Sequence, residues 1–175
     1  MYKIGPLLIV FLLIFSCTQE KKSVSEISDI EIATGYCHGE CPFSAMRVND
    51  KLTINYYGGD FASKKGYFIG KISQSLWDSL TTLLVDINYQ KLAPVYNKTK
   101  DDQAIEIIIT ANGVKKHVVA QEESLPKGVR NAFYEIAMIY KKVVLKPVAN
   151  SIKFNTKVQY MPKLIGKPKF PPASK

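Results

Sequence analysis

The stretch Ile105–Ala120, IEIIITANGVKKHVVA, contains the clearest folding signal in the sequence. Two apolar runs, Ile105–Thr110 and Val114–Ala120, flank Ala111-Asn112-Gly113. Asn-Gly favours the left-handed backbone conformations that a tight two-residue turn requires, and apolar runs on both sides of it predict an antiparallel hairpin. The domain is therefore expected to contain a β-sheet.

Before this hairpin the sequence predicts further strands and one helix. Strands are expected at Phe43–Val48, Leu52–Tyr57 and Gly66–Lys71, with a shorter candidate at Glu31–Tyr36. Ser73 is a suitable N-cap, and Trp77 and several leucines recur at helical spacing over Gln74–Ile87. This segment is therefore expected to be an amphipathic helix.

After the hairpin a second amphipathic helix is expected to begin around Pro126. The order βββ-α-ββ-α predicts an α+β domain of about residues 30–145, an antiparallel sheet with two helices packed on one face. Ser151–Tyr160 alternates apolar and polar residues and is a candidate edge strand. It lies within a Lys/Pro-rich C-terminal tail, residues 146–175, of which Met161–Lys175 is expected to be flexible.

Composition and charge narrow the function without identifying it. The 175 residues are 46% hydrophobic, enough for one globular domain. The net charge of +9 resides near the C-terminus, because residues 141–175 contain nine Lys and no acidic residue. Arg47 and Arg130 are the only arginines, so the forked contacts that read phosphates and guanine edges are scarce. We therefore expect no nucleic-acid partner.

The N-terminus predicts export and lipid anchoring. Lys3 precedes the apolar run Leu7–Phe15, which is long enough for a secretory signal but too short to span a bilayer. The run leads into Ile14-Phe15-Ser16-Cys17, which resembles a bacterial lipobox. This predicts a signal peptide over residues 1–16, lipidation of Cys17, including palmitate, and a polar tether over residues 17–29. Thr18 after the Cys favours the outer membrane, facing the periplasm or the cell surface.

The remaining cysteines, Cys37 and Cys41, predict a disulfide in an oxidising compartment. In an extended strand their Cα atoms would be about 13 Å apart, which is too far to bridge. Residues 37–41 must therefore turn, and Gly39 suits such a turn. Two alternatives remain open: a redox pair with Cys37 attacking and Cys41 resolving, and a metal site of Cys37, His38, Glu40 and Cys41.

The element Cys37-His38-Gly39-Glu40-Cys41-Pro42 resembles the start of an uncharacterised domain family of bacterial lipoproteins and secreted proteins. Its pattern is C-x-G-x-C-P, followed by strands, a helix, a hairpin and a helix. Further matching positions are Tyr56 or Tyr57, Gly58, Gly66, Trp77 or Leu80, and Asn112-Gly113. The resemblance covers roughly residues 37–140. It implies a fold and a location, and no activity is assigned to that family.

No constellation of residues predicts an enzyme or a cofactor. There is no G-x-S-x-G motif, and His38 and His117 are the only candidate general bases. We expect a non-enzymatic, lipid-anchored envelope protein with a disulfide-clipped interaction domain; the alternative is a periplasmic thiol–disulfide protein. Beyond the membrane, the partner classes are an envelope protein, a glycan or anionic lipid. The residues that would form a binding patch, if exposed together, are Tyr36, Tyr56, Tyr57, Phe61, Tyr67 and Phe68.

Overall fold

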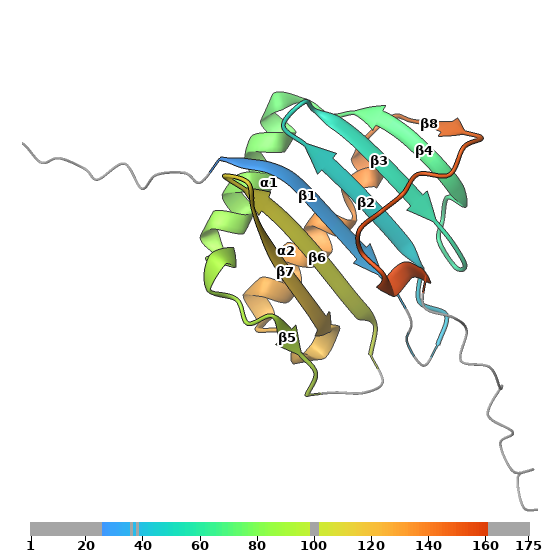
Figure 1. Cartoon of the computed structure of the whole chain (residues 1–175). Coiled ribbons are helices and arrows are strands. Elements are labelled where there is room, and N and C mark those ends of the chain that lie inside the picture. The colour runs from blue at the N-terminus through green and yellow to red at the C-terminus, as the bar shows by residue number, and fades with distance from the viewer. Residues whose placement is uncertain (1–25, 36, 38, 99–101, 161–175) are drawn as a thin grey trace, which may run out of the picture.

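The computed structural model describes residues 26–35, 37, 39–98 and 102–160 (Figure 1). The strands are β1 (Ile27–Thr34), β2 (Ser44–Asn49), β3 (Thr53–Gly58), β4 (Gly66–Lys71), β5 (Val95–Tyr96), β6 (Ala104–Ala111), β7 (Val114–Gln121) and β8 (Leu145–Val148). The helices are α1 (Gln74–Asp86) and α2 (Lys127–Ala137), with short 3-10 turns η1 (Tyr89–Lys91), η2 (Glu122–Ser124), η3 (Ile139–Lys142) and η4 (Val158–Tyr160).

The strands form one sheet in the order β5-β7-β6-β1-β2-β3-β4-β8. The α+β class is confirmed, but the sheet is mixed, because β5 pairs with β7 in parallel and the other pairs are antiparallel. The predicted order βββ-α-ββ-α is also incomplete, since four strands precede α1 and both edge strands were missed. A two-residue strand shows no periodicity, and Pro147 inside β8 argues against a strand in a sequence.

The Asn-Gly hairpin forms as predicted. β6 and β7 pair in register from Ala104–Gln121 to Ala111–Val114. Asn112 and Gly113 have φ of 50° and 76°, the left-handed conformation at both central positions of the turn. β1 then pairs with β6 and β2 with β1, so the hairpin extends into the main sheet.

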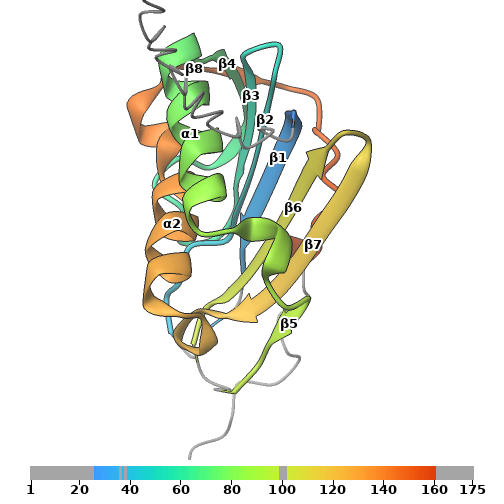
Figure 2. The ribbon, with the colours of Figure 1, turned by 90° about the vertical axis from the view of Figure 1, so that its left-hand side faces the viewer.

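Both helices lie on the same side of the sheet (Figure 2). The Ser73 hydroxyl accepts a hydrogen bond from the Leu76 amide, as expected of the N-cap of α1. Residues from both helices and from the alternate positions of β1, β2, β3 and β6 form one apolar core. Its fully buried members include Ile30, Tyr56 and Phe133.

A segment without regular strand pairing, residues 149–160, crosses the opposite face of the sheet towards the end of β1 (Figure 1). The predicted edge strand at Ser151–Tyr160 is therefore wrong, although its alternation is real: Phe154, Thr156 and Val158 are buried. We refer to residues 149–160 as the strap. The predicted tail, Met161–Lys175, lies outside the described residues.

Two buried carboxylates of the sheet hold the strap by hydrogen bonds. Glu31 of β1 is 0% exposed and accepts hydrogen bonds from the Thr156 amide at 2.6 Å and from Asn155 Nδ2 at 3.1 Å. Glu106 of β6 is 3% exposed and accepts from the amides of Lys157 at 2.6 Å and Val158 at 3.0 Å. These amides donate to side chains and not to a neighbouring strand, so the segment does not join the sheet by a ladder.

Candidate functional site

The structure joins Cys37 and Cys41 in a disulfide with a Cα–Cα distance of 5.9 Å. The residues between them turn, as the spacing requires, and the Gly39 amide donates to Cys37 Sγ at 3.2 Å. Cys37 is buried, with 8% of its surface exposed, and Cys41 is half-buried. The bond closes a turn at the end of β1 and directly before β2.

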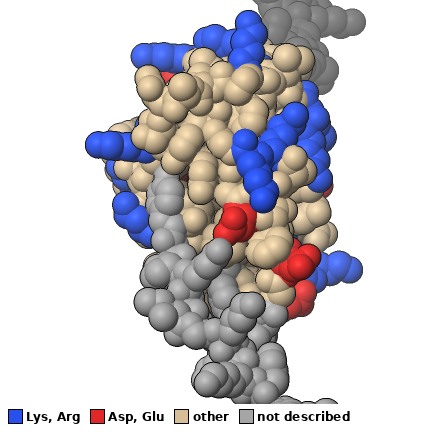
Figure 3. All heavy atoms as spheres, turned by 90° about the vertical axis from the view of Figure 1, so that its right-hand side faces the viewer, with Lys and Arg blue, Asp and Glu red and all other residues tan. Residues whose placement is uncertain are grey.

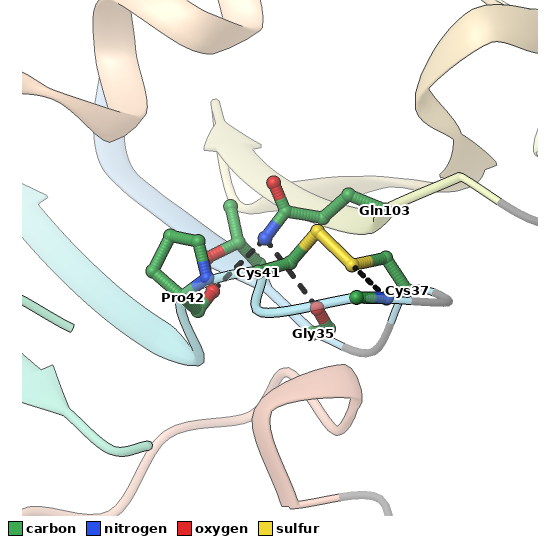
Figure 4. The surroundings of a disulfide bond; sticks show 7 residues. Gly35, Cys37, Cys41, Pro42 and Gln103 are labelled. Carbon is green, nitrogen blue, oxygen red and sulfur yellow. Dashed lines mark hydrogen bonds between the residues drawn. A yellow bond between two sulfur atoms is a disulfide. The ribbon is translucent and has the colours of Figure 1, made fainter. Parts of the chain in front are cut away.

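Gln103 ties this turn to the sheet (Figure 4). Its side-chain amide donates to the carbonyl of Pro42 at 2.9 Å and to that of Gly35 at 3.4 Å. The Thr34 hydroxyl also donates to the Pro42 carbonyl, at 2.8 Å. The residues on both sides of the disulfide, Gly35 and Pro42, are thus hydrogen-bonded to the residue directly before β6.

A cleft of about 370 Å³ opens beside the turn, between the sheet and the end of α2. Its walls combine hydroxyl, amide and charged groups with aromatic and aliphatic side chains. The lining residues are Thr34, Pro42, Ser44, Phe61, Ser63, Gln103, Ile105, Glu122, Tyr134, Ala137, Met138, Tyr140 and Lys141. The size suits one amino-acid side chain or a small ring, and the mixture of polar and apolar groups is typical of binding sites.

Two aromatic side chains at the cleft are exposed although they are large and apolar. Phe61 is 52% exposed and has a φ of 59°, a conformation that non-glycine residues adopt only when their surroundings impose it. Tyr134 of α2 is 55% exposed. Tyr134 and Glu122 also line a neighbouring hollow of about 340 Å³, so the recess continues along α2.

One carboxylate that lines the cleft, Glu122, lies in surroundings that disfavour its charged form. Burial raises the pKa of Glu122, and the neighbouring carboxylates of Glu123 and Asp102 raise it further, while Arg130 lowers it. Arg130 itself forms an ion pair with Glu123. The Asp102 carboxylate accepts a hydrogen bond from the Glu123 amide at 2.7 Å, next to Glu122.

The other aromatic residues of the predicted patch separate onto the two faces of the sheet. Tyr56 points into the core and stacks on Tyr140 at 4.3 Å. Tyr57 pairs with Tyr67 at 4.9 Å, at positions that alternate with the core-facing ones. Tyr36 lies outside the described residues, and of the five described members of the set Phe61 alone lines the cleft. A single exposed patch of all six residues is therefore excluded.

The described residues bring together no catalytic constellation. His117 pairs with Glu106 at 2.7 Å on the strap side of the sheet. The second oxygen of Glu106 accepts from the strap, and within the described ranges no hydroxyl is hydrogen-bonded to His117. Among these residues no three His, Cys, Asp or Glu side chains could hold a metal ion. His38, one of the four metal ligands considered, lies outside the described residues.

The geometry around the disulfide gives no support to a redox site. A reactive cysteine is usually exposed and placed at a helix N-terminus or beside a cation, which stabilise the thiolate. Cys37 is buried, and none of the helices in the described part of the chain begins at it.

Sequence reasoning missed two deeply buried carboxylates, Glu31 and Glu106. Each interrupts an apolar run, in Ile30-Glu31-Ile32 and in Ile105-Glu106-Ile107. Their alternation with isoleucine was a signal, since a Glu within a run of core residues faces the opposite side of the strand. What covers that side could not be predicted, because the strap lies more than 50 residues away in sequence from Glu106.

Cys17 and the signal peptide lie outside the described residues, so lipidation stays a prediction. Within residues 26–35, 37, 39–98 and 102–160, no helix is long and apolar enough to cross a membrane.

A protein-family model described as a domain of unknown function, DUF6438, matches residues 28–140. The chain belongs to this family. The resemblance predicted from the cysteine turn and the strand pattern is thereby confirmed at the level of an uncharacterised domain family. No curated protein matches the sequence. The family match ends at residue 140, so β8 and the strap lie beyond it.

Proposed function

We propose that this chain is a lipid-anchored protein of the bacterial cell envelope whose domain binds an envelope protein through the cleft beside the disulfide turn. The N-terminal lipobox-like sequence supports the anchor: after cleavage, Cys17 would carry acyl chains, and two or more chains hold a protein stably on a membrane. Thr18 supports attachment to the outer membrane, facing the periplasm or the cell surface.

The cleft carries the proposal for binding. A protein that keeps Phe61 and Tyr134 half-exposed beside a recess gives up the free energy that their burial would contribute. Aromatic side chains at the edge of a recess are the anchors of protein interfaces, where a partner completes their burial. The disulfide and Gln103 fix one wall, and a wall fixed in advance loses less entropy on binding.

Photo-crosslinking in the bacterial envelope tests both the lipid anchor and the binding of a protein partner at the cleft. A photoreactive phenylalanine analogue replaces Phe61 in the full chain, and cells are labelled with radioactive palmitate. The control places the same analogue at Val114, the first residue of β7, which is 71% exposed and does not line the cleft. We expect one discrete, protease-sensitive adduct from position 61 and none from position 114, with the label lost in the Cys17→Ala variant.

Three outcomes contradict the proposal. Adducts from both positions in equal yield would show that the cleft has no selectivity. An adduct resistant to proteases but sensitive to glycan hydrolases would replace the protein partner by a glycan. Retention of palmitate in the Cys17→Ala variant would place the lipid elsewhere.

A further inference from the structure

Two segments that meet at one edge of the sheet contain no acidic residue. Residues 61–77 and residues 136–160 are far apart in sequence, and the nearest acidic residues are Asp60, Asp78 and Glu135. The segments pair as β4 and β8, with Ile69 opposite Lys146. A hydrogen bond of 3.1 Å between the hydroxyls of Ser63 and Tyr140 joins them next to this pairing.

This pairing gathers exposed cations around exposed aliphatic side chains. Val144 is 84% exposed and Ile69 is 44% exposed. Seen from the side of β4 and β8, Lys and Arg side chains lie above and on both sides of a broad uncharged area, and acidic side chains lie towards its lower border (Figure 3). We call this surface the lysine edge; it consists of Ile69, Val144 and the exposed residues Lys64, Lys65, Lys71, Lys141, Lys142 and Lys146.

Protection of the sheet edge explains only part of this surface. A lysine and a proline on an edge strand prevent pairing with another chain, and Lys146 and Pro147 of β8 serve that purpose. Edge protection requires neither the lysines of η3 and of the β3–β4 loop nor a valine with most of its surface in water. The combination indicates a partner that is both anionic and apolar.

We propose that the lysine edge is the surface by which the domain lies on an anionic lipid bilayer. The proposal rests on the anchored function above, which keeps the domain within a short tether of a membrane. Each lysine near an anionic leaflet strengthens binding about fivefold. The contributions of the six lysines of this surface multiply, so together they can hold the domain on the membrane. Val144 and Ile69 lie among these cations, where aliphatic side chains reach below the headgroups. A polyanionic glycan would supply negative charge but no apolar region in which Val144 and Ile69 could be buried.

Vesicle sedimentation of the unlipidated mature chain, residues 18–175, tests this contact without the anchor. The vesicles contain phosphatidylcholine alone or with phosphatidylglycerol, at low and high salt. The test variant is Lys71→Glu/Lys142→Glu/Lys146→Glu. The control for net charge, Lys91→Glu/Lys98→Glu/Lys127→Glu, reverses three exposed lysines elsewhere. A third variant, Lys163→Glu/Lys167→Glu/Lys169→Glu, reverses charge in the C-terminal tail.

We expect binding to phosphatidylglycerol vesicles only, weakened by salt. The lysine-edge variant should bind at least about tenfold more weakly than both other variants, given about fivefold per lysine. If its circular dichroism differs from that of the parent chain, the milder Lys64→Gln/Lys65→Gln/Lys142→Gln variant replaces it. Equal losses in all three variants, a loss confined to the tail variant, or no binding to anionic vesicles would overturn the proposal. None of these results bears on palmitate at Cys17, so the two proposals fail separately.

Discussion

Among single residues, the buried Tyr56 makes the stability of the fold depend on pH. Tyr56 is fully buried, and burial followed by the neighbouring Tyr140 raises its pKa above the ordinary value of 10.0. The folded protein therefore holds this proton more tightly than the unfolded chain. The stability from the neutral phenol is complete below the unfolded pKa and is lost as the pH rises through the folded pKa.

This predicts a specific alkaline weakness. Between about pH 9 and about pH 11, the free energy of unfolding of the parent chain should fall by about 1 kcal/mol more than that of Tyr56→Phe, since a phenylalanine has no proton to lose. Urea unfolding at the two pH values measures this difference. Tyr134→Phe, on the exposed face of α2, should behave as the parent chain. Parallel pH dependence of all three proteins would contradict the assignment to Tyr56.

Residue-level prediction from the sequence was most accurate where one local rule decides the conformation. Asn112-Gly113 and the Ser73 cap needed only their own backbone geometry, and both are as expected. The cleft could not be predicted, because Phe61, Gln103 and Tyr134 meet there only through the pairing of distant strands and the position of α2. Periodicity tells which face of a strand a residue occupies, and not what lies opposite.

At the scale of elements, the strap shows how a polar sheet face becomes part of the core. Its alternation of apolar and polar residues suggested a strand, yet buried carboxylates bind its amides in place of a neighbouring strand. Gly35 contributes to this fit, since a Cβ at that position would lie 2.4 Å from the Val158 carbonyl oxygen. The strap is therefore an integral layer of the domain, and the folded unit extends past the predicted boundary at residue 145.

Removing one carboxylate should release the strap. In Glu106→Ala, the amides of Lys157 and Val158 lose their acceptor in a buried position, which should lower the free energy of unfolding by about 2–4 kcal/mol. Hydrogen exchange at these two amides should accelerate in the same variant. The matched control is His117→Ala, which deletes the half-exposed partner of the same carboxylate and should cost less than about 1 kcal/mol. Equal effects of the two substitutions would show that the ion pair, and not the strap, stabilises this face.

Over the whole domain, the two proposed surfaces lie in different places. The cleft lies beside the disulfide turn and α2, whereas the lysine edge lies along β4 and β8. The proposed binding of a partner at the cleft and the proposed membrane contact of the lysine edge can occur together. Lys141 is shared, because it belongs to both surfaces. The sequence could predict an excess of lysine after residue 140, but only the pairing of β4 with β8 shows where these lysines meet those of residues 64–71.

The Cys37–Cys41 disulfide lies in the turn that bounds the cleft. It closes a loop of a few residues, which constrains the unfolded chain by about 2 kcal/mol. That amount is modest for a domain of this size, so we expect the bond to matter chiefly for the shape of the turn that bounds the cleft. Its burial at Cys37 and the absence of a helix start there, among the described helices, both favour this structural role over redox chemistry.

A glutathione titration of the Cys37–Cys41 bond in residues 18–175 tests whether this bond is structural. Free thiols are counted by alkylation and mass spectrometry at each ratio of reduced to oxidised glutathione. A bond that clips a wall of the cleft should remain oxidised throughout the glutathione range. Ready reduction within that range, together with a thiol that ionises well below its ordinary pKa, would contradict the structural role and make the chain a thiol–disulfide protein.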